Sequence, residues 1–325
     1  MQFWNNMTNI IFEKQPINEE RQLSLLQSEK GIIIHDYDHC KKFLSKVSYY
    51  KLSGYWLHKK NKATNKFSSN TALDDIIKTY ELDLEIKQLI LVLLNHYETS
   101  LKTNFINLSL YISNEDCNLY KNSHFYLSKK IISSANYEKN LEDLQANINK
   151  NKSKLPFISW YQKKYDFPEM PPIWMVTELM TFGDISRWVK SIIHDEYVHI
   201  IPNKFGFHDK PSFDNINYIL TNLRNICAHN GRVFNNNIYG TRQEIINVAK
   251  LDQILDQKGV NPKLWNSIVL AVHGLHNCGL TKEMHNIIRT FDSIFEDQDY
   301  SQLKKSYYYY GFPPNWRQKL LDILT

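Results

Sequence analysis

The sequence predicts an all-α protein, because helical spacing of apolar residues dominates and strand-like alternation is rare. Glycine and proline, which interrupt regular structure, number only ten each among 325 residues. The clearest apolar stripe comprises Ile86, Leu89, Ile90, Leu93, Tyr97, Leu101, Phe105 and Leu108. Its members are mostly three or four residues apart, so they share one face of a helix that we expect from about Asp74 to Tyr111. The aromatic members favour a packed bundle over a coiled coil.

Short elements are expected before this helix. Residues 32–34 are three isoleucines that predict a short extended piece, and Asp36 or Asp38 can cap a following helix. An aromatic cluster comes next, at residues 49–56. We expect it to pack against the bundle, although its rings could also stack on nucleic-acid bases. Residues 61–70 read as a polar loop.

The middle of the chain contains several helix boundaries. Residues 133–153 predict a polar, solvated helix. Pro171 and Pro172 precede a helix at 173–180, because proline is tolerated in a first turn. Gly183 is expected to end this helix and Asp184 to cap the next one. Later helices are expected from Pro211 to Gly231, at 243–257, 262–276 and 281–296, and after the aromatic residues 307–316, where a short amphipathic helix follows.

Three segments are expected, packed as one unit. Residues 1–72 form an N-terminal helical segment, 73–245 a helical bundle core, and 246–325 a C-terminal helical extension. The net charge of +5 permits a polyanionic partner without requiring one.

Composition excludes several classes of protein. The longest apolar run, Leu89–Leu94, is much shorter than the ~20 residues of a membrane span. The N-terminus lacks the pattern of a signal peptide. The four cysteines (Cys40, Cys117, Cys227 and Cys278) are far apart and form no metal-binding pair. We therefore expect a cytoplasmic protein with reduced thiols, no membrane association, no metal site and no cofactor.

One short segment combines an arginine and a histidine in a suggestive pattern. Arg224 is followed by Asn225 and, five residues after Arg224, by His229, in the last turns of an expected helix. This spacing fits R-x(4–6)-H, the motif of HEPN ribonuclease domains. The bare pattern is weak, because chance alone predicts about one match in a chain with this many arginines and histidines. A second match, Arg187 with His194, has a tryptophan after the arginine, and we interpret Arg187 as a surface or interhelical residue.

The surroundings of the first match are more specific. Four blocks resemble, in order, those of the AbiD/AbiF-like abortive-infection family, whose members have a HEPN domain. The blocks are YYKLSGYW at 49–56, PPIW with EL and FGDISR at 171–187, LRNICAHNGR at 223–232, and FPPNW at 312–316. Two positions depart from the family pattern: Lys51 stands where arginine is usual, and the segment after Arg232 lacks the usual second arginine.

The resemblance implies a metal-independent endoribonuclease that acts as a toxin-like effector of phage defence. Histidine suits proton transfer near neutral pH, and arginine binds phosphate oxygens through two donors. We therefore predict that His229 transfers protons, Arg224 binds phosphate and the transition state, and Asn225 orients His229. Candidate RNA contacts are Arg232, Lys51 and Lys102, of which Lys102 can also form a helix-surface pair with Glu98.

The resemblance also implies partners. A homodimer would place two arginines and two histidines around one phosphate, since residues five apart on one helix do not meet. A small non-coding RNA is the implied restraint of the toxin. Two alternatives remain: a non-catalytic RNA-binding module, and an interaction protein that senses a phage component.

Overall fold

The computed structural model describes residues 15–113, 116–126, 135–151, 154–238, 251–255, 264–297, 300 and 306–325. Within these residues the fold is all-α, which confirms the predicted fold class. Extended structure there is confined to two isolated bridges, Ile33 with Ala72 and Lys60 with Phe67. The chain divides into two compact units, Met1–Glu81 and Leu82–Thr325, and each is described by itself. The three-segment division stays a prediction.

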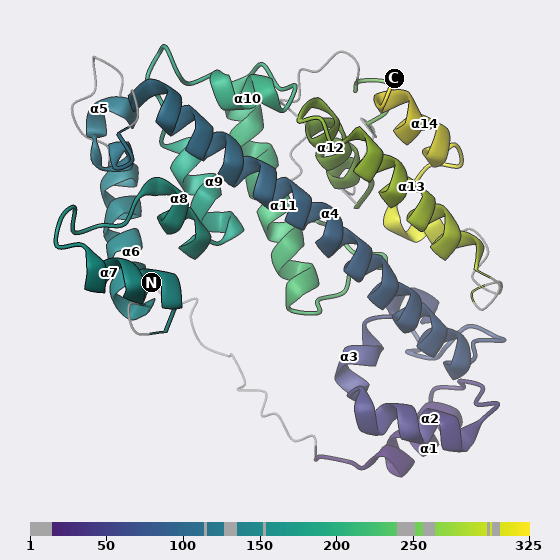
Figure 1. The fold of residues 1–325 in the computed structure, drawn as a ribbon. Helices are drawn as coiled ribbons and strands as arrows, with labels where there is room; N and C mark the ends of the chain where they lie inside the picture. Colours follow the sequence, from purple (N-terminus) through teal and green to yellow (C-terminus); the bar gives the residue numbers. More distant parts are fainter. Residues whose placement is uncertain are drawn as a thin grey trace, which may run out of the picture. The chain divides into compact units, whose positions relative to one another are not determined.

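Unit 1 is a small helical assembly. Its helices, shown in purple and dark blue in Figure 1, are α1 (Glu19–Ser28), α2 (Tyr37–Lys46), α3 (Tyr49–Ser53), the 3-10 helix η1 (Leu57–Lys59) and the first residues of α4 (Leu73–Ser113). Helix α1 packs against α2. The Asp36 side chain accepts a bond from the backbone N–H of His39, so Asp36 is the N-cap of α2, one of the two predicted caps.

Two of the four aromatic side chains in the cluster at residues 49–56 are buried, and Tyr49 is half-buried. Tyr55 and Trp56 are each about 1% exposed. The Trp56 ring lies edge-on to Phe67, with ring centroids 5.7 Å apart, and Tyr55 makes a similar contact with Tyr80 at 5.3 Å. The expectation that this cluster packs is confirmed for these rings. Tyr50 is the exception, with 89% of its surface exposed.

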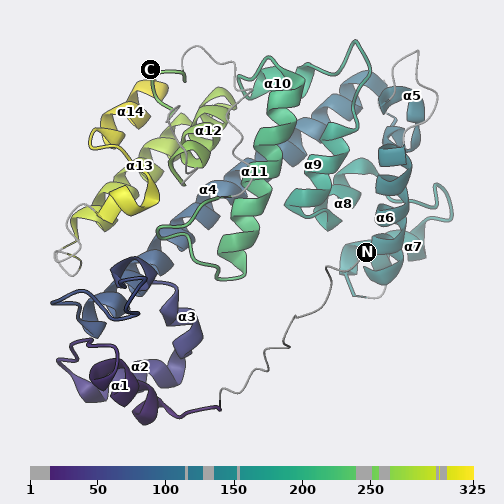
Figure 2. The ribbon, with the colours of Figure 1, turned by 180° about the vertical axis from the view of Figure 1, so that it is seen from behind.

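Helix α4 from Leu82 onward is the longest element of unit 2 and lines its core. Every member of the predicted stripe is buried, and the observed helix, Leu73–Ser113, matches the expected range closely. Helix α11 (Lys210–Ala228) packs against α9 (Phe182–Lys190) and α12 (Leu264–Asn277). In the opposite views of Figures 1 and 2, α11 crosses α4 at an angle. The two helices lie close together, because Arg224 Nη2 on α11 is 4.0 Å from Glu98 Oε2 on α4.

Two expectations for the start of α9 are wrong. Gly183 lies inside the first turn of α9, and the N-cap is Thr181 rather than Asp184. Asp184 is instead the third helical residue of a capping box, accepting a bond from the backbone N–H of Thr181 at 2.9 Å. The upstream segment divides into α8 (Ile173–Val176) and a 3-10 turn, η3 (Thr177–Leu179).

The prediction of a polar, solvated helix at residues 133–153 is wrong about solvation, because the observed helix α6 (Ala135–Asn151) buries one face. Its residues Tyr137, Leu144 and Ile148 are buried, and α6 packs against α9. Tyr137 lies edge-on to Trp188, with ring centroids 6.0 Å apart. One apolar stripe at helical spacing is sufficient to bury a helix whose other positions are polar. Neighbouring short helices are η2 (Leu119–Lys121), α5 (Ser123–Tyr126), α7 (Pro156–Lys164) and α10 (Ile200–Lys204).

The C-terminal part of unit 2 is built around α12. Residues 264–275 of this helix are all buried, so it is covered on every side. Helices α13 (Thr281–Glu296) and α14 (Trp316–Ile323) pack on it, with the 3-10 helix η6 (Ser306–Tyr310) before α14. The expected helix at 243–257 lies mostly outside the described residues, and its described part, 251–255, forms turns. None of the helices in the described ranges combines the length and the apolar character of a membrane span.

Candidate functional site

The end of α11 is fixed by a specific backbone motif. His229 is the C-cap residue, and Asn230 follows with a positive φ of 53°. The N–H of Gly231 donates to the carbonyl of Ile226 at 2.6 Å, and the N–H of Asn230 donates to the carbonyl of Cys227 at 2.9 Å. These two bonds define a Schellman motif. A side chain at Gly231 would meet the Ile226 carbonyl at 3.0 Å, which explains the glycine there.

A buried ion pair on α4 anchors the turn that follows His229. Asp83 and Lys87 are one helical turn apart, 3.4 Å between Oδ2 and Nζ, and their side chains are 0% and 3% exposed. Lys87 Nζ also donates to Asn230 Oδ1 at 2.6 Å. The Asp83 carboxylate accepts from the backbone N–H groups of Val233 (3.3 Å) and Phe234 (2.8 Å), and from the Tyr310 hydroxyl at 3.2 Å. The pair thus holds both sides of the turn.

A second set of charged groups surrounds Arg224. Glu98 on α4 forms an ion pair with Lys102 at 3.0 Å, as the spacing predicts. The other oxygen of Glu98 lies 4.0 Å from Arg224 Nη2, and Arg224 Nη1 donates to Asn225 Oδ1 at 3.3 Å. The Arg224 side chain is 30% exposed, whereas the side chains of Glu98 and Lys102 are 14% and 17% exposed. The structure therefore places Arg224 and Lys102 around the Glu98 carboxylate, and Asn225 is hydrogen-bonded to Arg224.

His229 lies at the exposed end of the same helix. Its residue is exposed, and so is Asn225 one turn earlier. The backbone N–H of His229 donates to the carbonyl of Asn225 at 3.0 Å. The amide oxygen of Asn225 accepts from Arg224, so the predicted orienting bond from Asn225 to the His229 imidazole stays a prediction. Arg232 is half-buried three residues further on, and Lys51 is half-buried on α3 of unit 1.

The nearest cysteine to this helix end gives a test of its packing. Burial, followed by the charge of Asp83, raises the pKa of the Cys227 thiol to about 12. Because the thiolate is the nucleophile, we expect iodoacetamide at pH 8 to label Cys227 at least 100-fold more slowly in the native protein than in urea. Mass spectrometry of the modified peptide measures both rates. Comparable rates would contradict a stably packed end of α11.

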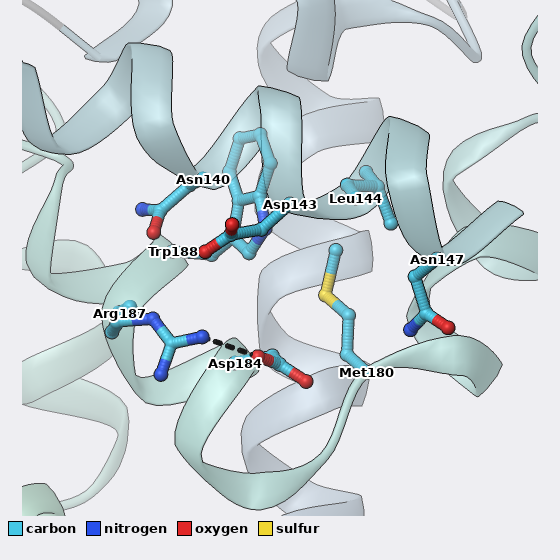
Figure 3. A pocket seen from close by; sticks show the side chains of 8 residues that line it. All are labelled: Asn140, Asp143, Leu144, Asn147, Met180, Asp184, Arg187 and Trp188. Carbon is cyan, nitrogen blue, oxygen red and sulfur yellow. Dashed lines mark hydrogen bonds and ion pairs between the residues drawn. The ribbon is translucent and has the colours of Figure 1, made fainter. Parts of the chain in front are cut away.

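The second arginine–histidine match belongs to a different environment (Figure 3). Arg187 Nη2 lies 2.5 Å from Asp184 Oδ1, an intrahelical pair on the surface of α9, in agreement with its interpretation as a surface residue. Arg187 borders a small cavity of about 30 Å³. The charged groups around the cavity are this guanidinium and the carboxylates of Asp143 and Asp184, and its volume suits a water-sized molecule. This excess of carboxylates disfavours a phosphate there.

Sequence comparison identifies the family of the chain. A family model described as Abi-like protein matches residues 42–235, more than half of the chain. The chain belongs to the Abi-like protein family. No curated protein and no solved structure shows a significant match to it.

The match to the Abi-like family includes both the Arg224 group and the Asp83–Lys87 pair. It ends before α12, so the fourth block, at 312–316, lies outside it.

Sequence reasoning missed Asp83, Lys87 and Asn230. Acidic and basic residues four apart within an apolar stripe were the available signal, because charges at such positions are buried only when they are paired. In the described part of the chain, no group of three or more His, Cys, Asp or Glu side chains is arranged to hold a metal ion.

Proposed function

We propose that this Abi-like protein is a HEPN-type endoribonuclease that cuts RNA without a metal ion and acts as an effector of phage defence. The observation that supports it is the end of α11, where an exposed imidazole and a partly exposed guanidinium project from a rigid, buried framework. This supports the proposal because catalytic side chains must be held in a defined geometry.

The chemistry needs only these side chains and the RNA. The ribose 2′-oxygen attacks the adjacent phosphorus, and the bond from phosphorus to the 5′-oxygen breaks. A base accepts the 2′-hydroxyl proton, and an acid donates a proton to the departing 5′-oxygen. In this proposal His229 transfers protons, while Arg224 and Lys102 bind the negative phosphate oxygens. The products are a 2′,3′-cyclic phosphate, which water can open to a 3′-phosphate, and a 5′-hydroxyl.

A homodimer would complete the site. One imidazole cannot act as base and acid in the same step, and in this proposal the partner subunit's His229 fills the second role. Three exposed residues, Tyr218, Asn225 and His229, are spaced seven and four apart along one face of α11. Such a face can meet its own copy across a two-fold axis, bringing two arginines and two histidines to one phosphate.

The direct test is to incubate the purified protein with total RNA in the presence of EDTA and to map the new ends. We expect 2′,3′-cyclic phosphates or 3′-phosphates and 5′-hydroxyls. Intact RNA, or cleavage that EDTA abolishes, would refute the proposal. RNA binding without cleavage would favour the non-catalytic alternative.

The two arginine–histidine matches provide an internal comparison. We expect Arg224→Ala to lower the cleavage rate by about 10²–10³, the usual effect of removing one transition-state donor. Arg187→Ala should leave the rate within about twofold. Arg187 lies on α9 rather than on α11, and it is paired with Asp184 of the same helix. Initial rates on a labelled RNA measure both. Equal losses in the two variants would remove the distinction on which the assignment depends.

A growth-arresting nuclease must be restrained in healthy cells. Its family suggests a small non-coding RNA as the restraint, which would bind as partner rather than as substrate. Sequencing of RNA that copurifies with the His229→Ala variant tests this part. A single abundant species would support it, and a random sample of cellular RNA would refute it.

A further inference from the structure

The positive charge of this protein is concentrated in one segment of unit 1. Residues 39–73 contain eight lysines and no aspartate or glutamate. The whole chain has a net charge of +5, so all the other residues together have a net charge of −3. A general lysine bias would not exclude carboxylates from 35 consecutive residues while leaving the rest of the chain acidic.

Half of these lysines lie on or beside one closed loop. We call residues 59–68 the lysine hairpin. Lys60 pairs with Phe67 in an antiparallel bridge, and two further backbone bonds, Asn61 N–H to the Lys66 carbonyl and Ser68 N–H to the Lys59 carbonyl, are both 2.9 Å long. These bonds confine the lysines of the hairpin (Lys59, Lys60, Lys62 and Lys66) to a small volume.

A further lysine, Lys30, lies close to Lys60 at the base of the hairpin. Burial, together with the charge of Lys30, lowers the pKa of Lys60. Lys30 is adjacent because its carbonyl accepts the N–H of Phe67 at 2.9 Å. Lys60 Nζ lies 5.1 Å from the Phe67 ring centroid and 5.8 Å from that of Trp56, a cation–π arrangement that fixes the base of the hairpin.

The exposed side chains of the hairpin are polar, and its exposed lysines have no carboxylate in ion-pair distance among the described residues. These lysines are Lys59, Lys62 and Lys66. The exposed residues between and after them are mostly amides and hydroxyls, namely Asn61, Thr64, Asn65, Ser68, Ser69 and Asn70. Phe67, the one large apolar side chain of the hairpin, is 8% exposed. The loop therefore offers cations and hydrogen-bond donors, and no large apolar group that could enter a lipid bilayer.

We propose that the lysine hairpin is a docking surface for the phosphate backbone of single-stranded RNA, distinct from the Arg224 and His229 group that we assign to cleavage. Lysine is a point charge that binds phosphates without reading sequence, so this surface would give affinity rather than specificity. The choice of RNA as the polyanion rests on the proposed function, whereas the anionic docking surface rests on the hairpin itself.

The test is a binding measurement from which cleavage is excluded. The probe is a fluorescein-labelled, fully 2′-O-methylated single-stranded RNA of about 30 nucleotides, which has no free 2′-hydroxyl to attack. The full-length variant Lys59→Gln/Lys62→Gln/Lys66→Gln removes three exposed charges, and the matched control is Lys139→Gln/Lys150→Gln/Lys163→Gln, three exposed lysines of α6 and α7. Circular dichroism and thermal melting confirm that both variants fold.

We expect the hairpin variant to bind the RNA at least tenfold more weakly near 100 mM salt, and the control to bind within about twofold of the unmodified protein. The slope of log affinity against log salt should become shallower by up to about 2, since each phosphate contact to a single strand contributes about 0.7. Unchanged affinity in the hairpin variant, or equal losses in the two variants, would overturn the proposal.

Two further outcomes separate this proposal from its alternatives. Binding to phosphatidylserine vesicles that depends on the hairpin, with RNA affinity independent of it, would identify a membrane surface and overturn the proposal. If the hairpin binds RNA but the protein cuts none, the RNA-docking surface stands and the nuclease proposal fails. If the protein cuts RNA and the hairpin variant binds and cuts as well as the unmodified chain, the nuclease proposal stands and the RNA-docking proposal fails.

Discussion

Replacing His229 by alanine is expected to lower the rate of RNA cleavage by about 10²–10⁴, the range for a lost general acid or base. In a dimer whose site needs both imidazoles, the change removes both, so the upper end of the range is expected. RNA affinity should change little, because the hairpin lysines and Arg224 remain. Initial cleavage rates and anisotropy with the 2′-O-methylated RNA measure the two quantities separately.

The matched control is His208→Ala, which removes an exposed histidine of the same unit that lies just before α11. This variant should keep full activity. Cleavage by His229→Ala at the unmodified rate would eliminate His229 as the proton-transfer group. A parallel loss of RNA affinity would instead indicate a binding role, in agreement with the non-catalytic alternative.

The fold was predictable wherever a long apolar period determined it. The stripe from Ile86 to Leu108 identified α4, and all its members are buried. Short segments were less predictable, because the same residue type is favoured at more than one position near a helix start. An aspartate near a helix start can be the N-cap or the third helical residue of a capping box, and Asp184 is the latter. In α6, polar neighbours concealed an apolar stripe that packs against α9.

Only the local part of the candidate site could be proposed from the sequence. Arg224, Asn225 and His229 are close in sequence, and their spacing on one helix made them candidates. The Glu98–Lys102 pair was expected on a helix surface, and only the folded chain places its carboxylate 4.0 Å from Arg224. Asp83 and Phe234 are 151 residues apart, and no local pattern predicts their hydrogen bond. Such a contact depends on how α4 packs against the end of α11.

The two members of the buried Asp83–Lys87 pair should contribute unequally to the free energy of unfolding. Asp83→Ala removes the acceptor of two backbone N–H groups and of the Tyr310 hydroxyl, and it leaves the Lys87 charge buried without its anionic partner. We expect a loss of about 3–5 kcal/mol in the free energy of unfolding, the range for breaking a buried ion pair. Lys87→Met leaves those three donors on the Asp83 carboxylate, so its expected cost is smaller, about 1–3 kcal/mol. Urea unfolding measures both.

The same two variants separate stability from positioning at the candidate site. Lys87→Met removes the bond to Asn230 Oδ1, which directly follows His229, while the Asp83 bonds to Val233 and Phe234 remain. We therefore expect hydrogen exchange to accelerate at residues 229–231 and to stay slow at 233–234, with a reduced cleavage rate well below the melting temperature and unchanged RNA affinity. Full activity in Lys87→Met would mean that the Schellman turn alone positions His229. A larger loss of stability in Lys87→Met than in Asp83→Ala would contradict the assignment of Asp83 as the centre of the network.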